Sequence, residues 1–334
     1  MSTREETLNP MAVGGQAVLE GVMMRAPGMV ATAVRRANGE IVVRKEPHTS
    51  LSEKYRTLKL PILRGTVGLI EMMAIGIRTL NFSAAEVAME DGSLQAGTKG
   101  NGTPRPENTW KDNLRLNATV AFSLAVGVAV FFVTPLAVTT FFFDVEQEPL
   151  WFNLIAGGVR IALLLGYLTA ISMPKDIRRL FQYHGAEHKA VIAFEKGEPL
   201  TVEAAARQSR FHPRCGTSFL LIVMFVAIVL FSLLDALLIQ WLGNVNVAIH
   251  VATHVPLIPL VGGVSYEFIR VSAKHSATPL GKVLVAPGLW LQHITTKEPD
   301  MPQLEVALTA LRCALGQEGL PLTSSLKPAS VVLN

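Results

Sequence analysis

Two histidines and a glutamate stand close together in the segment YHGAEHKAVIAFE. His184 and His188 are four residues apart, so on a helix both imidazoles project from one face and can bind one divalent ion. Glu187 stands beside His188, which completes the pattern H-x-x-E-H of the inverted zincins. In that pattern the two histidines bind zinc, and the glutamate acts as the general base toward metal-bound water. The motif therefore predicts a metal site with Glu187 as its catalytic residue.

Two further soft ligands follow in the segment FHPRCG, where His212 and Cys215 are three residues apart. The loop as a whole has the spacing H-x3-H-x23-H-x2-C, a strong metal signal in which nitrogen and sulfur donors favour zinc over other transition ions. Three protein ligands plus water would make a catalytic site, whereas four would close a structural one. In the structural alternative Glu187 would only hold a histidine tautomer.

Inverted zincins usually complete the zinc shell with a carboxylate far downstream. Glu267 in SYEFIR, 79 residues after His188, is the candidate for that ligand. Arg270, one helical turn later, offers Glu267 an ordinary ion-pair partner instead. His275 is a further candidate ligand. Whether Glu267 binds the metal or pairs with Arg270 stays open at this point.

The composition excludes an ordinary soluble enzyme and a disordered chain. Half of the 334 residues are hydrophobic, 17% are charged and the mean hydropathy is +0.37. Two cysteines far apart predict no disulfide and a reducing compartment. The start of the chain shows no cleavable signal.

Four apolar stretches are long enough to cross a bilayer, and they form two hairpins. The first hairpin is residues 116–173, with spans at 116–143 and 150–173; the second is 218–266, with spans at 218–242 and 245–266. Of the 30 Lys and Arg, 15 precede the first span, 8 lie in residues 174–216 and 6 follow Glu267. By the positive-inside rule, we expect a multi-pass inner-membrane protein with both termini and the central loop in the cytoplasm.

The segments outside these spans have distinct patterns. Residues 1–60 contain the short strand-like runs AVLEGVMMR, VATAVRR and EIVVRKE, with an Asn38-Gly39 turn, and predict a small antiparallel sheet. Residues 61–90 predict an amphipathic helix at the membrane interface, with a further span as the alternative. The other expected segments are a flexible linker (91–115), the metal-binding helical loop (174–217), a C-terminal cytoplasmic region with an amphipathic helix (267–318) and a disordered tail (319–334).

Several blocks of the chain together resemble one known family. They are GGQAVLEGVMMR, LRG, YHGAEHKA, HPRCGTSF, SYEFIR and PGLWLQHITTKEPDMPQLEVAL. Their order is similar to that of the bacterial YqhQ-like family, a domain-of-unknown-function group described as predicted metal-dependent membrane proteins. The resemblance covers roughly residues 13–315. It implies an integral membrane protein with a metal centre formed by His184, Glu187, His188, His212 and Cys215, and it implies no particular reaction.

The sequence thus predicts a mainly α polytopic membrane protein with a zinc-dependent hydrolase site on its cytoplasmic face. The alternative is a non-enzymatic scaffold or transporter with a structural zinc. The expected partners are the lipid bilayer and a membrane-proximal substrate or protein. Nucleic acid is not expected, because topology already accounts for the basic residues and no aromatic stacking run accompanies them.

Overall fold

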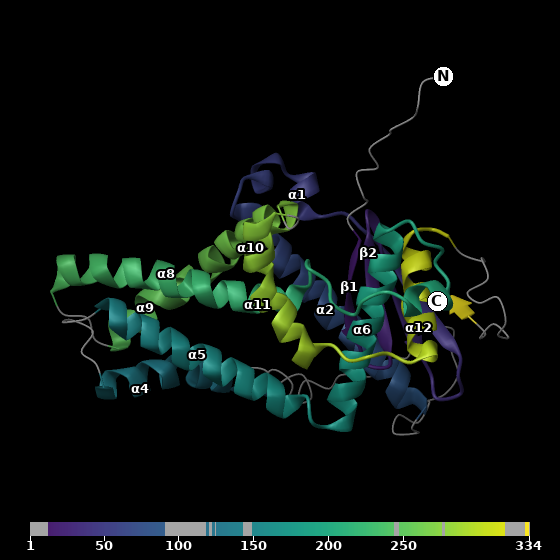
Figure 1. Ribbon diagram of the computed structural model, residues 1–334, viewed down its shortest axis with the longest axis horizontal. Helices are drawn as coiled ribbons and strands as arrows, with labels where there is room; N and C mark the ends of the chain where they lie inside the picture. Colours follow the sequence, from purple (N-terminus) through teal and green to yellow (C-terminus); the bar gives the residue numbers. More distant parts are fainter. Residues whose placement is uncertain are drawn as a thin grey trace, which may run out of the picture.

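The computed structural model describes residues 13–90, 118–119, 122–123, 125–142, 149–243, 247–275, 278–317 and 331–333. In this part the protein is mainly helical, with a small sheet and four helices long and apolar enough to cross a membrane. The predicted linker, residues 91–115, lies outside the described residues. The sheet lies at one end of an elongated molecule and the long helices α5 and α8 extend from it toward the other end (Figure 1).

The sheet is an antiparallel meander of β1 (Gly14–Val18), β2 (Gly21–Ala26), β3 (Gly28–Arg35) and β4 (Ile41–His48). The predicted antiparallel element is confirmed, and Arg35 pairs with Ile41 across the expected Asn-Gly turn. The run AVLEGVMMR, however, is two strands and not one. The chain reverses at Glu20, which has a positive φ of 49°. The residues on the two sides of this turn, Gly14–Val18 and 21–25, pair with each other.

Both faces of the sheet are covered by helices. On one face, α6 (Lys175–Glu195) and α12 (Met301–Ala314) share a core with alternate strand residues such as Val22 and Met24. On the other face Met23 and Val30 pack on α2 (Leu63–Glu90). Figure 1 shows α6 and α12 side by side against the strands. The alternation of side chains along β2 therefore places apolar residues in two separate cores.

Part of the tail that was expected to be disordered is a strand. β5 (Val331–Leu333) pairs in parallel with β4 and extends the sheet to the order β1-β2-β3-β4-β5. β4 would otherwise have a free edge, and the β-branched residues of β5 suit an added strand.

The long apolar helices form the other half of the molecule. The four candidate spans are Leu63–Ala88, Ala125–Phe142, Trp151–Ile171 and Phe219–Leu242. They belong to α2, to the π-helical turn η2 (Ala129–Val133) with α4 (Thr134–Phe142), to α5 (Pro149–Ile171) and to α8 (Gly216–Leu242). These helices indicate that the protein associates with a membrane.

The predicted fourth span, residues 245–266, is not one continuous helix. It is divided into α9 (Val247–His254), the 3-10 turn η3 (Val255–Leu257) and α10 (Ile258–Lys274). The break coincides with Pro256, which cannot donate a backbone hydrogen bond within a helix. His254 of α9 lies in the interior, with Nε2 3.4 Å from Oδ1 of Asp235, and Asn153 donates a hydrogen bond to Oδ2 of the same carboxylate at 2.7 Å. These contacts join α5, α8 and α9.

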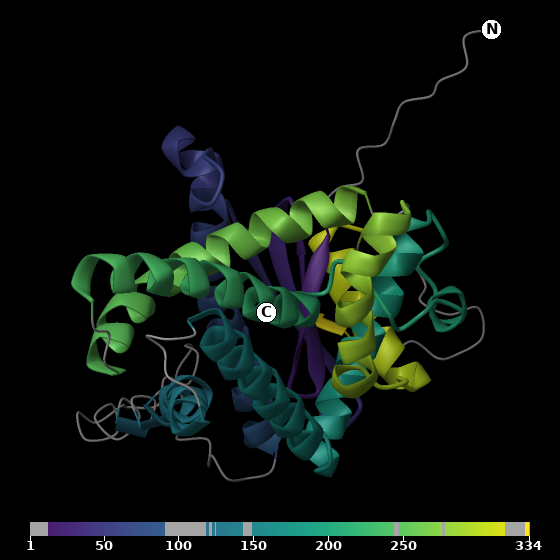
Figure 2. The same cartoon turned by 60° about the vertical axis from the view of Figure 1, so that its left-hand side comes forward.

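Helix α2 runs across the molecule, whereas α5 and α8 run along it (Figures 1 and 2). Two of its carboxylates face inward: Glu71 accepts a hydrogen bond from the hydroxyl of Ser50 at 2.7 Å, and Glu86 pairs with Arg36 at 2.6 Å. Its exposed residues include the large apolar side chains of Ile70, Met73, Ile77 and Leu80, together with Arg78 and Asn81. α2 therefore exposes several large apolar side chains while two of its charged groups are buried.

The remaining described helices are short or follow α10. They are α1 (Leu51–Lys54), the 3-10 helix η1 (Arg56–Lys59), α7 (Val202–Ala206) and α11 (Pro279–Thr295). α11 packs on α8 and brings its last turn to the start of that helix.

Candidate metal centre

Helix α6 holds the three residues of the H-x-x-E-H motif. Tyr183, Ala186, Ala190 and Ala193 bury one face of α6 in the core of the sheet half. This spacing of three and four residues fixes the rotation of the helix. Gly185 lets the segment after α11 approach closely, because a Cβ there would lie 2.1 Å from the carbonyl oxygen of Lys297.

Cys215 is positioned by the start of α8. It is the N-cap residue of this helix, and its sulfur accepts a hydrogen bond from the backbone N–H of Thr217 at 3.4 Å. A negative sulfur at a helix N-terminus is favoured by the helix dipole. Cys215 and Cys313 are both buried.

His184, His188 and Cys215 converge. One ligand atom from each of them lies within 4.8 Å of the other two, and the three residues are the one group of this kind among the described residues. The Nε2 atom of His184 is 3.2 Å from Sγ of Cys215, and the two imidazole centroids are 4.5 Å apart. The structure therefore brings together three of the five residues that were predicted as metal ligands.

Backbone carbonyls orient both imidazoles. Nδ1 of His184 lies 2.8 Å from the carbonyl oxygen of Thr295, and Nδ1 of His188 lies 2.5 Å from that of Arg210. Since a carbonyl oxygen only accepts, each Nδ1 must donate, which leaves the Nε2 lone pair free to bind an ion. Burial lowers the pKa of His188 and so favours the neutral form that metals require.

Glu187 is buried beside these residues. Its Oε2 atom is 3.6 Å from Nε2 of His188, and its carboxylate accepts a hydrogen bond from the backbone N–H of Gly15. Burial raises the pKa of the Glu187 carboxyl above its ordinary value, while the nearby His184 and His212 act in the opposite direction. A buried carboxylate next to a histidine pair is placed to exchange a proton with a group held there.

His212 lies near the group without joining it. Its ring centroid is 5.7 Å from that of His188. Its Nε2 is 3.3 Å from Glu195, which also pairs with Arg214, and its Nδ1 accepts a hydrogen bond from the backbone N–H of Arg214. Both ring nitrogens of His212 are thus engaged by other protein atoms.

Glu267 lies elsewhere, at the contact between α10 and α2. Both of its oxygens accept hydrogen bonds from the guanidinium of Arg64, at 2.6 and 2.5 Å. The Arg64 guanidinium lowers the pKa of Glu267. The predicted role of Glu267 as a ligand therefore has no geometric support, and its ion-pair partner is on α2 and not one turn away at Arg270. His275 is exposed at the end of α10, outside the group.

Other residues that build the site were not predicted. Gln292 of α11 makes two hydrogen bonds with the backbone of His212, both at 2.8 Å, and Thr295 supplies the carbonyl for His184. Almost any residue can supply a backbone N–H or carbonyl, so contacts of this kind cannot be recognised from the sequence. The chain GLWLQHITT shows only a helical pattern, so the approach of α11 could be found only from the fold.

These observations define a membrane-associated, mainly helical protein with a largely buried His–His–Cys group beside a small sheet. The chain belongs to the family described as protein of unknown function (DUF1385), whose model matches residues 60–317. It is similar to the uncharacterized protein YqhQ of Bacillus subtilis (strain 168), with 35% identity over 323 residues, which cover 93% of this chain and 94% of that protein. The predicted family is confirmed. No solved structure matches the chain.

Proposed function

We propose that the protein is a zinc-dependent integral membrane hydrolase. His184, His188 and Cys215 would hold the ion, and Glu187 would act as general base. The observation that carries this proposal is the convergence of two imidazoles, both anchored through Nδ1, on one cysteine sulfur. A buried carboxylate beside them supplies the acid–base group that a purely structural site does not need.

The donor set fits zinc. Zn–N bonds of about 2.0–2.1 Å and Zn–S bonds of about 2.3 Å place the donors of a tetrahedral site roughly 3.5 Å apart. The separation of 3.2 Å between Nε2 of His184 and Sγ of Cys215 is close to this value. Two nitrogens and one sulfur are also the donors that zinc accepts readily.

Zinc held by His184, His188 and Cys215 would supply an activated water as the nucleophile toward a carbonyl carbon. Glu187 would accept a proton at Oε2 and return it to the leaving group. His184 and His188 would keep their orientation through Thr295 and Arg210 during this exchange. The substrate would be a peptide, amide or ester at the membrane surface.

The site would lie on the cytoplasmic side of an inner membrane. The distribution of Lys and Arg supports this topology, with both termini in the cytoplasm. The exposed apolar side chains of α2, with Arg78 among them, support a helix that lies along the membrane interface between the sheet and the lipid. Its hydropathy of 1.2 is the lowest of the four candidate spans.

Elemental analysis of the detergent-purified protein tests the metal site. Wild type should carry about one zinc per chain, and His188→Ala and Cys215→Ser should each lose nearly all of it, because two remaining ligands hold zinc weakly. Cys313→Ser is the matched control and should keep the metal, since Cys313 lies in the core between α12 and the sheet. Absence of every transition metal from wild type, purified without chelators, would contradict the proposal.

His212→Ala distinguishes an enzyme site from a structural one. We expect this variant to keep about one zinc per chain, because both ring nitrogens of His212 already contact Glu195 and Arg214. A closed four-ligand site, as in a scaffold or transporter, would instead lose its zinc with His212. Metal content measured beside the His188→Ala variant separates these outcomes.

A further inference from the structure

Four polar side chains are buried together in the membrane half of the molecule. Asn153 and Arg160 come from α5, Asp235 from α8 and His254 from α9, and each is at most 6% exposed. The first three lie inside candidate spans. Charged groups within membrane-spanning helices are costly, and they occur mainly where ions or protons are bound or conducted. None of these residues takes part in the proposed hydrolysis.

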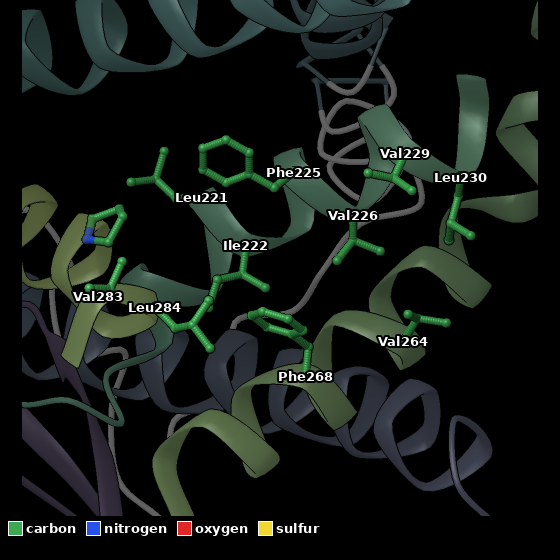
Figure 3. A pocket seen from close by; sticks show the side chains of 11 residues that line it. Leu221, Ile222, Phe225, Val226, Val229, Leu230, Val264, Phe268, Val283 and Leu284 are labelled. Carbon is green, nitrogen blue, oxygen red and sulfur yellow. The ribbon is translucent and has the colours of Figure 1, made fainter. Parts of the chain in front are cut away.

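This polar group is separate from the candidate metal centre. Asp235 follows Cys215 by 20 residues along α8, about 30 Å along the helix axis, and no charged residue lies between them in the sequence. Figure 3 shows part of this stretch, where Ile222 and Val226 of α8 lie on the side toward Phe268 of α10 in a groove lined by apolar side chains. Asp235 therefore belongs to a second site with partners of its own.

Hydrogen bonds within α9 determine which nitrogen of His254 carries a proton. The hydroxyl of Thr253 donates to the carbonyl oxygen of Ile249 at 2.7 Å, and Nδ1 of His254 lies 3.1 Å from the same hydroxyl oxygen. A hydroxyl has one proton to donate. Nδ1 of His254 must therefore donate to Thr253, and in a neutral imidazole this leaves Nε2 as an acceptor.

Nε2 of His254 faces a carboxylate. It lies 3.4 Å from Oδ1 of Asp235, whose Oδ2 accepts a hydrogen bond from the side-chain amide of Asn153 at 2.7 Å. An imidazole lone pair and an ionised carboxylate can only accept, so they repel unless a proton lies between them. The separation is slightly longer than the roughly 2.9 Å of an ordinary N–H···O bond, and a proton on either atom would draw the pair together. One proton thus completes the contact.

Arg160 supplies a charge that balances the carboxylate when this proton leaves. The Nε atom of Arg160 is buried and has no hydrogen-bond partner in the part of the chain that the structure describes. The guanidinium lies 5.4 Å from the ring centre of Phe132, whose ring in turn contacts the imidazole of His254, and the charge of Asp235 acts on Arg160. With the proton bound, the three ionisable side chains carry one net positive charge; without it, the charges of Asp235 and Arg160 cancel.

The other side chains around this group are apolar. Phe231 of α8 lies against the imidazole of His254 with centroids 4.3 Å apart, and Leu257 of η3 and Val261 of α10 pack in the same cluster as Phe231. Among the described side chains of α4, α5, α8 and α9, the charged or histidine residues are Arg160, Asp235 and His254. The charge of the group is therefore set by these three side chains.

We propose that Asp235 and His254 form a proton-binding site in the membrane half of the protein, with Arg160 as its counter-charge. The bound proton lies between Nε2 of His254 and Oδ1 of Asp235, and on release its bond to one of these atoms breaks and the proton passes to water. The two acceptors then repel each other, and the helix break at Pro256 lets α9 move away from α8. Broken helices of this kind form the ion and proton sites of membrane transporters. The site does not depend on the metal centre.

Nuclear magnetic resonance of isotope-labelled histidine rings tests the site in the full-length protein in nanodiscs. His254→Gln identifies the signals of His254. In wild type, Nδ1 should stay protonated, whereas Nε2 should lose its proton in one reversible step as the pH rises. Asp235→Asn should move this step by at least about one pH unit, a tenfold change in the proton-binding constant, because the carboxylate is gone. Glu267→Gln is the matched control and should leave the step in place, since Glu267 pairs with Arg64.

Two results in wild type alone would overturn the proposal. One is a neutral His254 ring with its proton on Nε2, because that ring would donate an ordinary hydrogen bond to Asp235 and need no further proton. The other is a ring that keeps the same protonation over the whole pH range in which the protein stays folded. A step that Asp235→Asn leaves unchanged in a folded protein would also overturn it.

Discussion

Replacing Glu187 by Gln is expected to leave zinc in the protein and to lower the turnover rate by about 10²–10⁴-fold, the usual contribution of a general base. Glu187 is not among the three converging residues that are proposed to hold the ion, so its loss should not release zinc. Glutamine has the same shape and still accepts the hydrogen bond from Gly15, but it cannot take up a proton at neutral pH. Hydrolysis of chromogenic carboxyl esters with short and long acyl chains measures the effect.

Glu195→Gln is the matched control for this experiment. Glu195 is on the same helix and contacts His212 and Arg214, so its replacement should change turnover far less. Zinc content of both variants is measured in the same samples. Full turnover in Glu187→Gln would remove Glu187 from the mechanism and leave a site that only binds metal.

Replacing Gly185 by Ala is expected to destabilise the protein by about 1–3 kcal/mol, the usual cost of overpacking. The new Cβ would lie 2.1 Å from the carbonyl oxygen of Lys297, so the backbone after α11 must move. That backbone is also held by a hydrogen bond of 2.8 Å from the N–H of Lys297 to the carbonyl of Phe181. Thr295 lies two residues before Lys297, and its carbonyl oxygen orients His184. We therefore expect zinc affinity to fall together with the stability of the protein.

Gly166→Ala provides the comparison. Gly166 is also inside a helix, α5, but nothing lies within 4 Å of a Cβ at this position. Alanine there should be neutral or stabilising by up to about 1 kcal/mol, because it favours the helix more than glycine does. Thermal unfolding in detergent and competition with a zinc chelator measure the two effects. Similar behaviour of both variants would show that the close contact at Gly185 does not constrain the site.

Local patterns predicted the elements of the fold better than their arrangement. The hairpin at Asn38-Gly39 and the helix at His184 follow from turn chemistry and periodicity, which act over a few residues. The break at Pro256 was missed because hydropathy alone does not register the lost backbone hydrogen bond. β5 was missed because a three-residue strand depends on the open edge of β4, which is almost 300 residues away in the chain.

In the site, too, local residue patterns predicted more than long-range packing did. His184, His188 and Cys215 have side chains and spacings that indicate metal binding, and the structure brings them together. Glu267 was predicted to be a metal ligand from its spacing alone. In the structure α10 packs on α2, and the Glu267 carboxylate accepts a hydrogen bond from Arg64. No property of the sequence near Glu267 indicated that partner, because the contact depends on how two distant helices cross.

The helices that cover one face of the sheet come from far along the chain, after several of the long apolar helices. Strands β1–β4 end at His48, whereas α6 starts at Lys175 and α12, which covers the same face, starts at Met301. A ribosome that adds about 5–20 residues per second needs roughly 10–50 s to synthesise the intervening residues 49–300. During that interval Val22 and Met24 lack their α12 partners. The order of synthesis therefore places the four candidate spans before α12, and a chain that stops before Met301 cannot complete that core.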